Sequence, residues 1–186
     1  MREHIHENMR NLSRLLEDSE LLVRVEKAIT IISDCLNDGL PLLVFGNGGS
    51  ASDSLHISGE LVGRFNLDRK GLNVICLNSN VTVLTAWSND VDFETVFSRQ
   101  VEAHKKMGGI AWGLTTSGNS ASVVNALKAA QTYGMATVAL TGSNGGKARN
   151  FADVLLNVPS NVTPRIQELH LLVYHYMCEV IERNCS

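Results

Sequence analysis

The sequence predicts an α/β protein, a three-layer sandwich in which helices cover both faces of a five-stranded parallel sheet, with further helices before the first strand. From residue 41 onward, short apolar runs alternate with helical patterns, as expected of consecutive βαβ units. The chain has 186 residues, 44% hydrophobic and 19% charged, which suits one domain with a single core. We therefore expect one domain over residues 1–186.

Two amphipathic helices are predicted within residues 1–40, before any strand. Apolar residues recur at helical spacing first at Ile5, Met9, Leu12 and Leu16, and then at Leu22, Val25, Ile29, Ile32 and Leu36. The segment 37–39, Asn-Asp-Gly, is expected to end the second helix. Since both helices precede the sheet, we expect both apolar stripes to need a partner outside it, such as a neighbouring subunit.

Five strands and a long final helix account for the rest of the architecture. The strands are predicted at residues 42–45, 72–77, 110–114, 135–140 and 154–158. The last helix is expected to run from about Pro164 to Glu182, with the proline in its first turn. Its predicted buried side comprises Ile166, Leu169, Leu172, Val173 and Met177.

Composition and charge argue against several classes of partner. The net charge is -3 and the 16 basic residues are scattered, so a nucleic-acid surface is disfavoured. No apolar stretch is long enough to span a bilayer, and the N-terminus lacks the apolar core of a signal peptide. The four cysteines form no C-x-x-C pair, which is typical of reduced thiols. We expect a cytoplasmic protein that binds neither nucleic acid nor membrane.

A glycine loop follows the first predicted strand and opens a helix. The free N–H groups of such a helix start favour an anionic or polyhydroxylated ligand. Gly46, Gly48 and Ala51 fit a permissive dinucleotide fingerprint, but the second strand has no acidic residue at its carboxyl end to bind a ribose. A nucleotide is therefore disfavoured, and the alternatives are a binding loop or a tight turn that only needs glycine's backbone freedom.

A second polar loop, 115–120 (TTSGNS), lies between the strand at 110–114 and a helix predicted at 123–133. Four hydroxyls, a glycine and a helix N-terminus suit a phosphate group. The alternative is that Ser117 or Ser120 only caps the helix. A third polar loop, 141–146, is less specific and is expected to be a connection. The two favoured loops would lie at carboxyl ends of parallel strands, where open α/β sheets bind ligands.

Histidine and carboxylate side chains recur at helical spacing around a candidate metal site. His56 and Glu60 are four residues apart, on one face of the helix after the glycine loop. On the last helix, Gln167 and His175 are eight apart and face one side, whereas His170 points elsewhere. Together the four side chains could form a divalent metal site of the zinc type. The alternatives are an ion pair between Glu60 and Arg64 and a merely packed or exposed His175. His4, His6 and His104 are expected to be solvated.

Taken together, the motifs resemble the sugar isomerase (SIS) domain and, within it, the phosphoheptose isomerase family. They are GNGGSASDSLHISGELVGRF, SNDVDFETVFSRQVEA, TTSGNSASVVNALKAA, ALTGSNGGK and TPRIQELHLLVYH. The resemblance implies a flavodoxin-like fold and a homotetramer in which the helices of residues 1–40 pack together, with active sites between subunits. It also implies conversion of sedoheptulose 7-phosphate to D-glycero-D-manno-heptose 7-phosphate through an enediol, for lipopolysaccharide or capsule precursors.

The same resemblance assigns roles to individual residues. Glu60 and His175 would be catalytic, and a zinc ion would be bound by His56, Glu60, Gln167 and His175. The substrate would be contacted by Asn47, Gly48, Gly49, Ser50, Glu60, Arg64, Asn89, Asp90, Thr115, Thr116, Ser117, Ser120 and Gln167. Two alternatives remain at this point. One is a phosphosugar-binding or replication-initiator-associating protein of the same fold, which would lack the catalytic glutamate and final histidine. The other is an isomerase of a different ketose phosphate.

Overall fold

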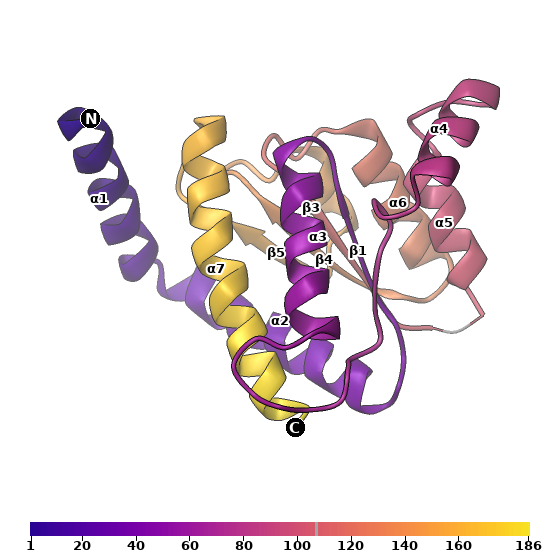
Figure 1. Cartoon of the computed structure of the whole chain (residues 1–186). Coiled ribbons are helices and arrows are strands. Elements are labelled where there is room, and N and C mark those ends of the chain that lie inside the picture. Colours follow the sequence, from indigo (N-terminus) through magenta and orange to yellow (C-terminus); the bar gives the residue numbers. More distant parts are fainter. Residues whose placement is uncertain (107) are drawn as a thin grey trace.

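The computed structural model describes residues 1–106 and 108–186 and has an all-parallel five-stranded sheet of order β2-β1-β3-β4-β5 (Figure 1). The strands are β1 (Leu42–Gly46), β2 (Val74–Cys76), β3 (Ile110–Thr115), β4 (Ala136–Thr141) and β5 (Val154–Asn157). All five lie where the apolar runs predict them, although β2 is shorter than the run at 72–77. The predicted fold class is confirmed.

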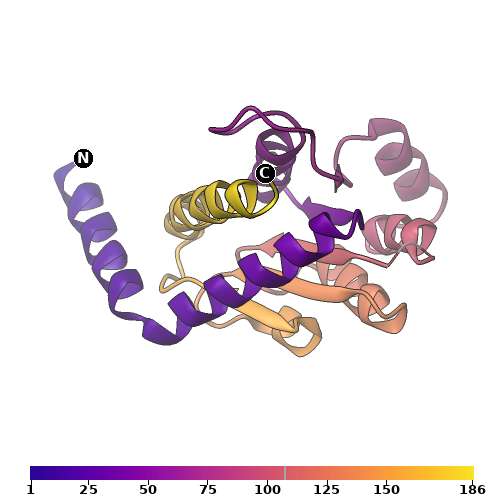
Figure 2. The same ribbon diagram turned by 90° about the horizontal axis from the view of Figure 1, so that it is seen from below.

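Helices cover both faces of this sheet (Figure 2). On one face, α2 (Ser19–Asn37), α3 (Gly49–Val62) and α7 (Thr163–Asn184) pack on a core that includes Leu42 and Val44 of β1. On the other face, α5 (Val96–His104) and α6 (Ala121–Thr132) pack on Leu43 and Phe45. The alternation of these four side chains along β1 is what lets one strand serve two cores. The remaining helices are α1 (Arg2–Glu17), α4 (Val81–Asp90) and the 3₁₀ helix η1 (Gly146–Phe151).

The two N-terminal helices differ in how they bury their apolar stripes. In α2, the side chains of Val25, Ile29 and Ile32 are buried in the core beside α7, so the expectation that this stripe needs a partner outside the sheet is wrong. The reason is that α2 returns across the sheet face, which its position before β1 does not reveal. In α1, by contrast, the stripe is exposed: Ile5, Met9, Leu12 and Leu16 are 48%, 58%, 43% and 75% accessible.

The final helix follows the predicted bounds closely and differs in its buried side. Ile166, Leu169, Val173 and Met177 are buried as predicted, but Leu172 is 47% exposed. His170 points away from the side of Gln167 and His175, as predicted, and is fully buried. His4 of α1 is exposed, as expected, and also contacts Arg165 and lies 3.4 Å from the carboxylate of Glu168. The face of α7 toward the sheet is thus wider than its leucine and valine pattern suggests.

A buried carboxylate fastens the chain that follows α3 to the end of α7. Glu182 has no exposed surface and accepts hydrogen bonds from the backbone N–H groups of Phe65, Asn66 and Leu67 at 3.1, 2.7 and 3.1 Å. It also pairs with Arg69 at 3.2 Å. Although burial alone would raise it, these donors and the guanidinium hold the pKa of Glu182 below its ordinary value. The carboxylate therefore stays charged without an unpaired charge in the interior.

None of the helices in the described part of the chain is both long and apolar enough to cross a membrane. The four cysteines, Cys35, Cys76, Cys178 and Cys185, are free thiols, as their spacing predicts. Burial raises the pKa of Cys35 to about 11, so this thiol resists ionisation and is a weak nucleophile.

The buried His170 should make stability depend on pH. Burial lowers the pKa of its imidazole from 6.5 to about 4. Between pH 6.5 and pH 4 the imidazole is therefore protonated in the unfolded chain and neutral in the folded chain. We expect the free energy of unfolding to fall below pH 6.5 by up to about 1.4 kcal/mol per pH unit, or about 3 kcal/mol by pH 4. Urea unfolding from pH 7 to 4 measures this, and in His170→Leu the decrease should be smaller by that amount. The exposed His6→Gln is the control, and equal pH profiles for His170→Leu and the wild type would contradict the prediction.

Candidate active site

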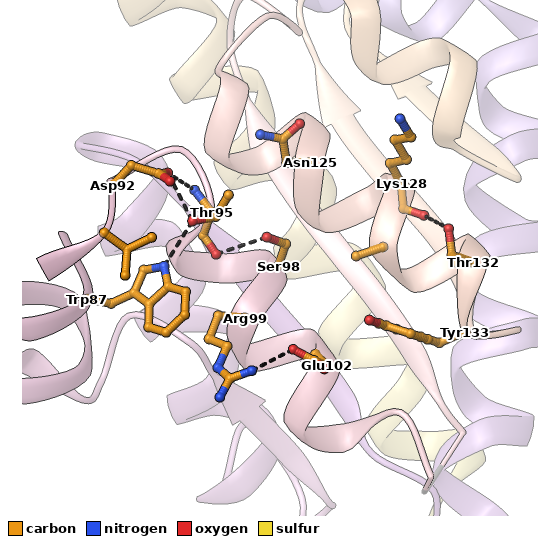
Figure 3. A pocket seen from close by; sticks show the side chains of 12 residues that line it. Trp87, Asp92, Thr95, Ser98, Arg99, Glu102, Asn125, Lys128, Thr132 and Tyr133 are labelled. Carbon is orange, nitrogen blue, oxygen red and sulfur yellow. Dashed lines mark hydrogen bonds and ion pairs between the residues drawn. The ribbon is translucent and has the colours of Figure 1, made fainter.

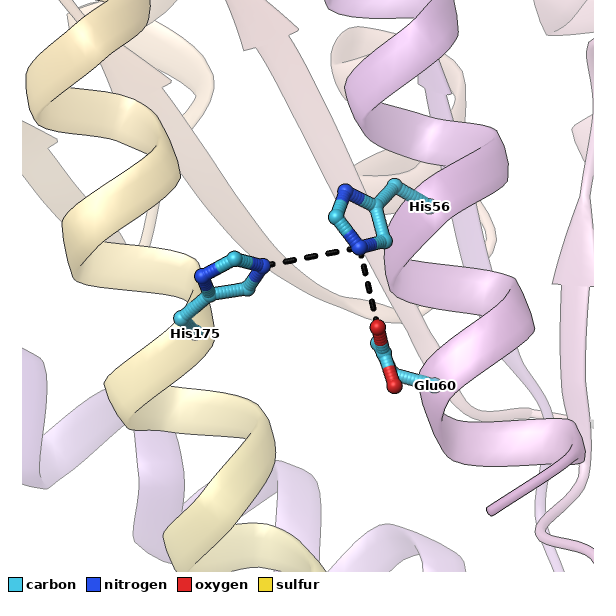
Figure 4. Close-up of side chains that lie close together, drawn as sticks. All are labelled: His56, Glu60 and His175. Atoms are coloured by element: carbon cyan, nitrogen blue, oxygen red, sulfur yellow. Dashed lines mark hydrogen bonds and ion pairs between the residues drawn. The ribbon is translucent and has the colours of Figure 1, made fainter. Parts of the chain in front are cut away.

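Three side chains from two helices meet at one point on the surface (Figure 4). The Nε2 atom of His56 lies 2.9 Å from Oε1 of Glu60, one turn further along α3, and 3.5 Å from Nε2 of His175 on α7. One donor atom from each residue lies within 4.8 Å of the others. The i, i+4 partner of Glu60 is therefore His56. Arg64 lies beyond the end of α3, exposed, and within the described residues it forms no ion pair with Glu60.

The side-by-side packing of α3 and α7 creates this meeting point. Gln167 lies against the first residue of α3, where a Cβ on Gly49 would come within 2.0 Å of the amide nitrogen, so any larger residue there would displace the glutamine side chain. Two turns further along α7, Tyr174 contacts Asp53 and His56. Gln167 and His175 thus both face α3, as predicted. Gln167, however, lies level with Gly49, seven residues or about 10 Å before His56 along the helix.

Burial and charge favour a neutral imidazole at this point. Burial lowers the pKa of His175, the nearby His56 lowers it further, and the carboxylate of Glu60 opposes the shift. This shift favours the neutral form of His175, the form in which an imidazole can bind a metal ion. Two imidazoles and one carboxylate are the donor set of metal sites with three protein ligands and an open position. The chemistry of His56, Glu60 and His175 fits a divalent cation.

Sequence reasoning missed two residues next to the candidate metal ligands, Tyr174, which contacts His56, and Asp53, which contacts Tyr174. The hydroxyl of Tyr174 lies 3.0 Å from Nδ1 of His56 and 3.4 Å from Oδ1 of Asp53. Asp53 precedes His56 by three residues and Tyr174 precedes His175 by one. The three-residue spacing on α3 was a usable signal for Asp53. In the sequence nothing distinguishes Tyr174 from an ordinary core residue, and in the structure it is fully buried.

The hydroxyl loop at 115–120 lies beside the glycine loop, because β1 and β3 are neighbours in the sheet. Asn47 donates a hydrogen bond to Ser122 at 2.8 Å, which joins the two loops. Ser120 is the N-cap residue of α6, but in the described structure its side chain makes no capping bond and accepts instead from Thr115 at 3.2 Å. The side chain of Ser117 accepts from the N–H of Asn119 within the loop at 3.1 Å. Capping therefore does not explain these hydroxyls.

The third polar loop does more than connect β4 to η1. Gly118 has a φ of +67°, and a Cβ there would lie 2.2 Å from the carbonyl oxygen of Gly145, so the two loops are in direct backbone contact. A cavity of about 290 Å³ lies where they meet the start of α7. It is lined by Thr116, Ser117, Gly142, Asn144, Asn161, Thr163 and Ile166. The expectation that residues 141–146 are only a connection is too narrow, because they form one wall of this cavity.

Two predicted substrate contacts lie elsewhere in the chain. Asn89 and Asp90 are exposed at the end of α4, bonded to each other at 2.9 Å. Figures 1 and 2 both show α4 at the opposite side of the molecule from α7. A groove of about 590 Å³ lies near them, between the α4–α5 segment and α6, and its lining includes none of the predicted site residues (Figure 3). Several of its side chains are paired with one another, such as Arg99 with Glu102 at 2.7 Å and Trp87 with Thr95 at 2.9 Å.

Comparison with known proteins identifies the family. A model of the SIS domain matches residues 4–142. A phosphoheptose isomerase of Crocosphaera subtropica is 49% identical over 158 residues, which are 85% of this chain and 81% of the relative. The structures of phosphoheptose isomerases from Neisseria gonorrhoeae and Francisella tularensis are 39% and 30% identical, with TM-scores of 0.87 and 0.91, and each comparison covers 98% of this chain and 96% of the other. The chain therefore belongs to the phosphoheptose isomerase family of SIS-domain proteins.

Proposed function

We propose that this chain converts sedoheptulose 7-phosphate to D-glycero-D-manno-heptose 7-phosphate, in the synthesis of heptose for lipopolysaccharide or capsule. The observation that carries the proposal is the meeting of a carboxylate and two imidazoles from α3 and α7. A ketose–aldose isomerase needs a base for a carbon-bound proton and a second group for the oxygen-bound proton. The names of the relatives support the same activity.

The substrate would be held at both ends. Thr115, Thr116, Ser117 and Ser120 would bind the phosphate with hydroxyls and with the N–H groups at the start of α6. Asn47, Gly48, Gly49, Ser50 and Gln167 would contact the sugar from the glycine loop and α7. The hydrogen bond between Asn47 and Ser122 would keep the two binding loops at a fixed separation. This arrangement directs C1 and C2 of the sugar toward the helices that carry Glu60 and His175.

Proton transfer would use two groups in sequence. Glu60 removes a proton from C1, and the electron pair of that C–H bond forms the C1–C2 double bond while negative charge develops on O2. Neutral His175 takes the hydroxyl proton from O1 and delivers it to O2. Glu60 then returns its proton to C2, and the C1–O1 double bond forms the aldehyde. Both residues end as they began, and each positioned acid or base contributes about 10² to 10⁴ in rate.

We propose zinc as the cation held by His56, Glu60 and His175, with Gln167 as a further ligand or a substrate contact. Bound zinc would polarise the sugar carbonyl and stabilise negative charge on its oxygen. His56 is then a ligand only, whereas His175 would serve as ligand and as base in turn, because its Nε2 has a single lone pair. One carboxylate oxygen of Glu60 faces His56, which leaves its second oxygen for proton transfer.

We further propose a homotetramer in the cytoplasm, with α1, the first helix of residues 1–40, as its oligomerisation helix. The exposed apolar stripe of α1 supports an interface between copies, because a stripe of this length in water is unfavourable. Asn89 and Asp90 are exposed at the end of α4, which lies away from α7. They would therefore contact substrate held by a neighbouring subunit, whereas the exposed Arg64 would reach the substrate from the end of α3. The four free thiols suit a reducing compartment.

Substitution of the proposed base provides the first test. Glu60→Gln should lower kcat by at least about 10²-fold, because the amide cannot accept the C1 proton, while phosphosugar binding measured by calorimetry weakens little. Turnover is followed as aldose formed from sedoheptulose 7-phosphate, with hexose and pentose ketose phosphates in parallel to test the sugar. The control is Glu179→Gln, a surface position on α7 that pairs with Arg183. Near-normal turnover by Glu60→Gln would remove Glu60 from the role of base.

Metal removal provides an independent test. Exhaustive treatment with a chelator should abolish isomerisation and lower the melting temperature, because an ion that binds only the folded state stabilises it. Zinc should restore both properties. If neither activity nor melting temperature responds, the metal proposal is wrong even where the isomerase activity is present.

The proposed interface on α1 can be tested by measuring the mass of the assembly in solution. Leu16→Glu places a charge at its most exposed leucine and should reduce the mass measured by light scattering from that of a tetramer to a smaller species. Arg14→Gln, on the polar face of the same helix, changes the net charge by the same amount and should leave the mass unchanged. A wild-type monomer, or a tetramer in Leu16→Glu, would contradict this interface.

A further inference from the structure

The third polar loop holds the hydroxyl loop by its backbone. The carbonyl oxygen of Thr116 accepts a hydrogen bond from the N–H of Gly142 at 3.0 Å, and that of Gly118 accepts one from the N–H of Ala148 at 2.9 Å. The two backbones also touch, because a Cβ on Gly146 would lie 2.6 Å from the carbonyl oxygen of Gly118. The loop at 115–120 is therefore fixed against the chain at 142–148.

The side chain of Asn119 adds a further link between these loops. Its Oδ1 accepts from the backbone N–H of Lys147 at 3.0 Å, and its Nδ2 donates to the carbonyl oxygen of Ser117 at 2.9 Å. Because a backbone N–H only donates and a carbonyl only accepts, the amide can lie only this way round. Lys147 is 28 residues further along the chain, so the link does more than stabilise a local turn. Asn119 is exposed, yet it is bonded through both ends of its amide.

These bonds decide which backbone groups of the loop are free for a ligand. The three consecutive carbonyl groups at 116–118 all accept hydrogen bonds from the third loop or from Asn119. By contrast, the N–H groups of Ser117, Ser120 and Ala121 have no hydrogen-bond partner within residues 1–106 and 108–186. An anion is attracted by N–H groups and repelled by carbonyl oxygens. A loop with paired carbonyls and free donors therefore suits a phosphate group.

We propose that Asn119 is a positioning residue of the phosphate site, which acts by joining the hydroxyl loop to the third polar loop. It would keep the carbonyl of Ser117 paired with a protein donor and the free N–H groups in place, without contacting the ligand itself. The inference rests on the proposed function in taking residues 115–120 as the phosphate site. It also gives the third polar loop a role, as the support on which this site is built.

Removal of the amide tests the link. Asn119→Ala loses both hydrogen bonds and should weaken the binding of inorganic phosphate by about 10-fold, measured by ³¹P NMR titration. The KM for sedoheptulose 7-phosphate should rise by the same factor while kcat stays within about twofold, because Glu60 and His175 lie on other helices. A general loss of folded protein would lower the apparent kcat and leave KM unchanged.

The matched control for this variant is Asn125→Ala. Asn125 is an exposed residue of α6 whose Nδ2 donates to the carbonyl oxygen of Glu94 at 3.1 Å, away from both loops. It should bind phosphate as the wild type does. Unchanged phosphate affinity in Asn119→Ala, or a loss of kcat without a rise in KM, would overturn the proposal.

A second pair of variants separates the loops without changing Asn119. Gly146 has a φ of +51°, and Gly146→Ala places a Cβ against the backbone of Gly118, so the loops must move apart. Gly134→Ala introduces alanine at a similar φ of +73° in the turn after α6, where the Cβ meets nothing within 4 Å. Both variants carry the same kind of backbone strain, but only Gly146→Ala should lose phosphate affinity. Equal affinities in the two variants would contradict the role of the third loop.

The phosphate titration needs no sugar, so it is independent of turnover. A wild type that binds phosphate but isomerises no ketose phosphate would refute the proposed function, and the phosphate affinities of the four variants would still decide the role of Asn119. A wild type that binds no phosphate would overturn the positioning role.

Discussion

The contact between α3 and α7 is the constraint on which the candidate site depends. His56 and His175 are 119 residues apart in the chain, and only the register of these two helices brings their ring nitrogens to 3.5 Å. Three points along the interface fix that register. Gln167 fills the space left by Gly49 at one end, Tyr174 contacts Asp53 and His56 in the middle, and Glu182 binds the chain after α3 at the other end. A shift of one turn in either helix would separate the imidazoles by about 5 Å.

The contact at Glu182 also explains why the ion pair of Arg69 and Glu182 is buried where apolar residues could pack instead. Arg69 and Glu182 are almost inaccessible, and the cost of desolvating them is offset by hydrogen bonds that no apolar pair could make. Arg69 also donates to the backbone carbonyl of Glu60 at 3.0 Å and to that of Gly63 at 3.3 Å. These carbonyls belong to the last turn of α3 and to its C-cap residue, and they lack a partner within the helix. The ion pair therefore ends α3 at a defined place, two residues after Glu60, and so fixes the backbone that carries this carboxylate.

Local patterns predicted those features that depend on one element at a time. The strands follow from apolar runs, and the closeness of His56 to Glu60 follows from helical spacing alone. Features that need two elements were predicted less well. The stripe of α2 is buried because the helix returns over the sheet, and Leu172 is exposed because the neighbours of α7 leave that side open. Tyr174 could not be recognised from sequence, since its role depends on where α3 places Asp53 and His56. Asn89 and Asp90 lie at the far side of the chain, so no pattern within one subunit shows what they contact.

The electrostatics of the three side chains are suited to a cation better than to protons. Two protonated imidazoles at 3.5 Å would repel each other, and one carboxylate could balance only one of them. The depressed pKa of His175, caused by burial and by His56, reflects this competition and leaves its nitrogen unprotonated near neutral pH. A divalent ion bound there would replace the repulsion between protons with two coordinate bonds and the charge of Glu60. The nitrogen of His175 that would bind this ion is also the one that would accept a hydroxyl proton from the sugar, so the two roles compete for a single lone pair.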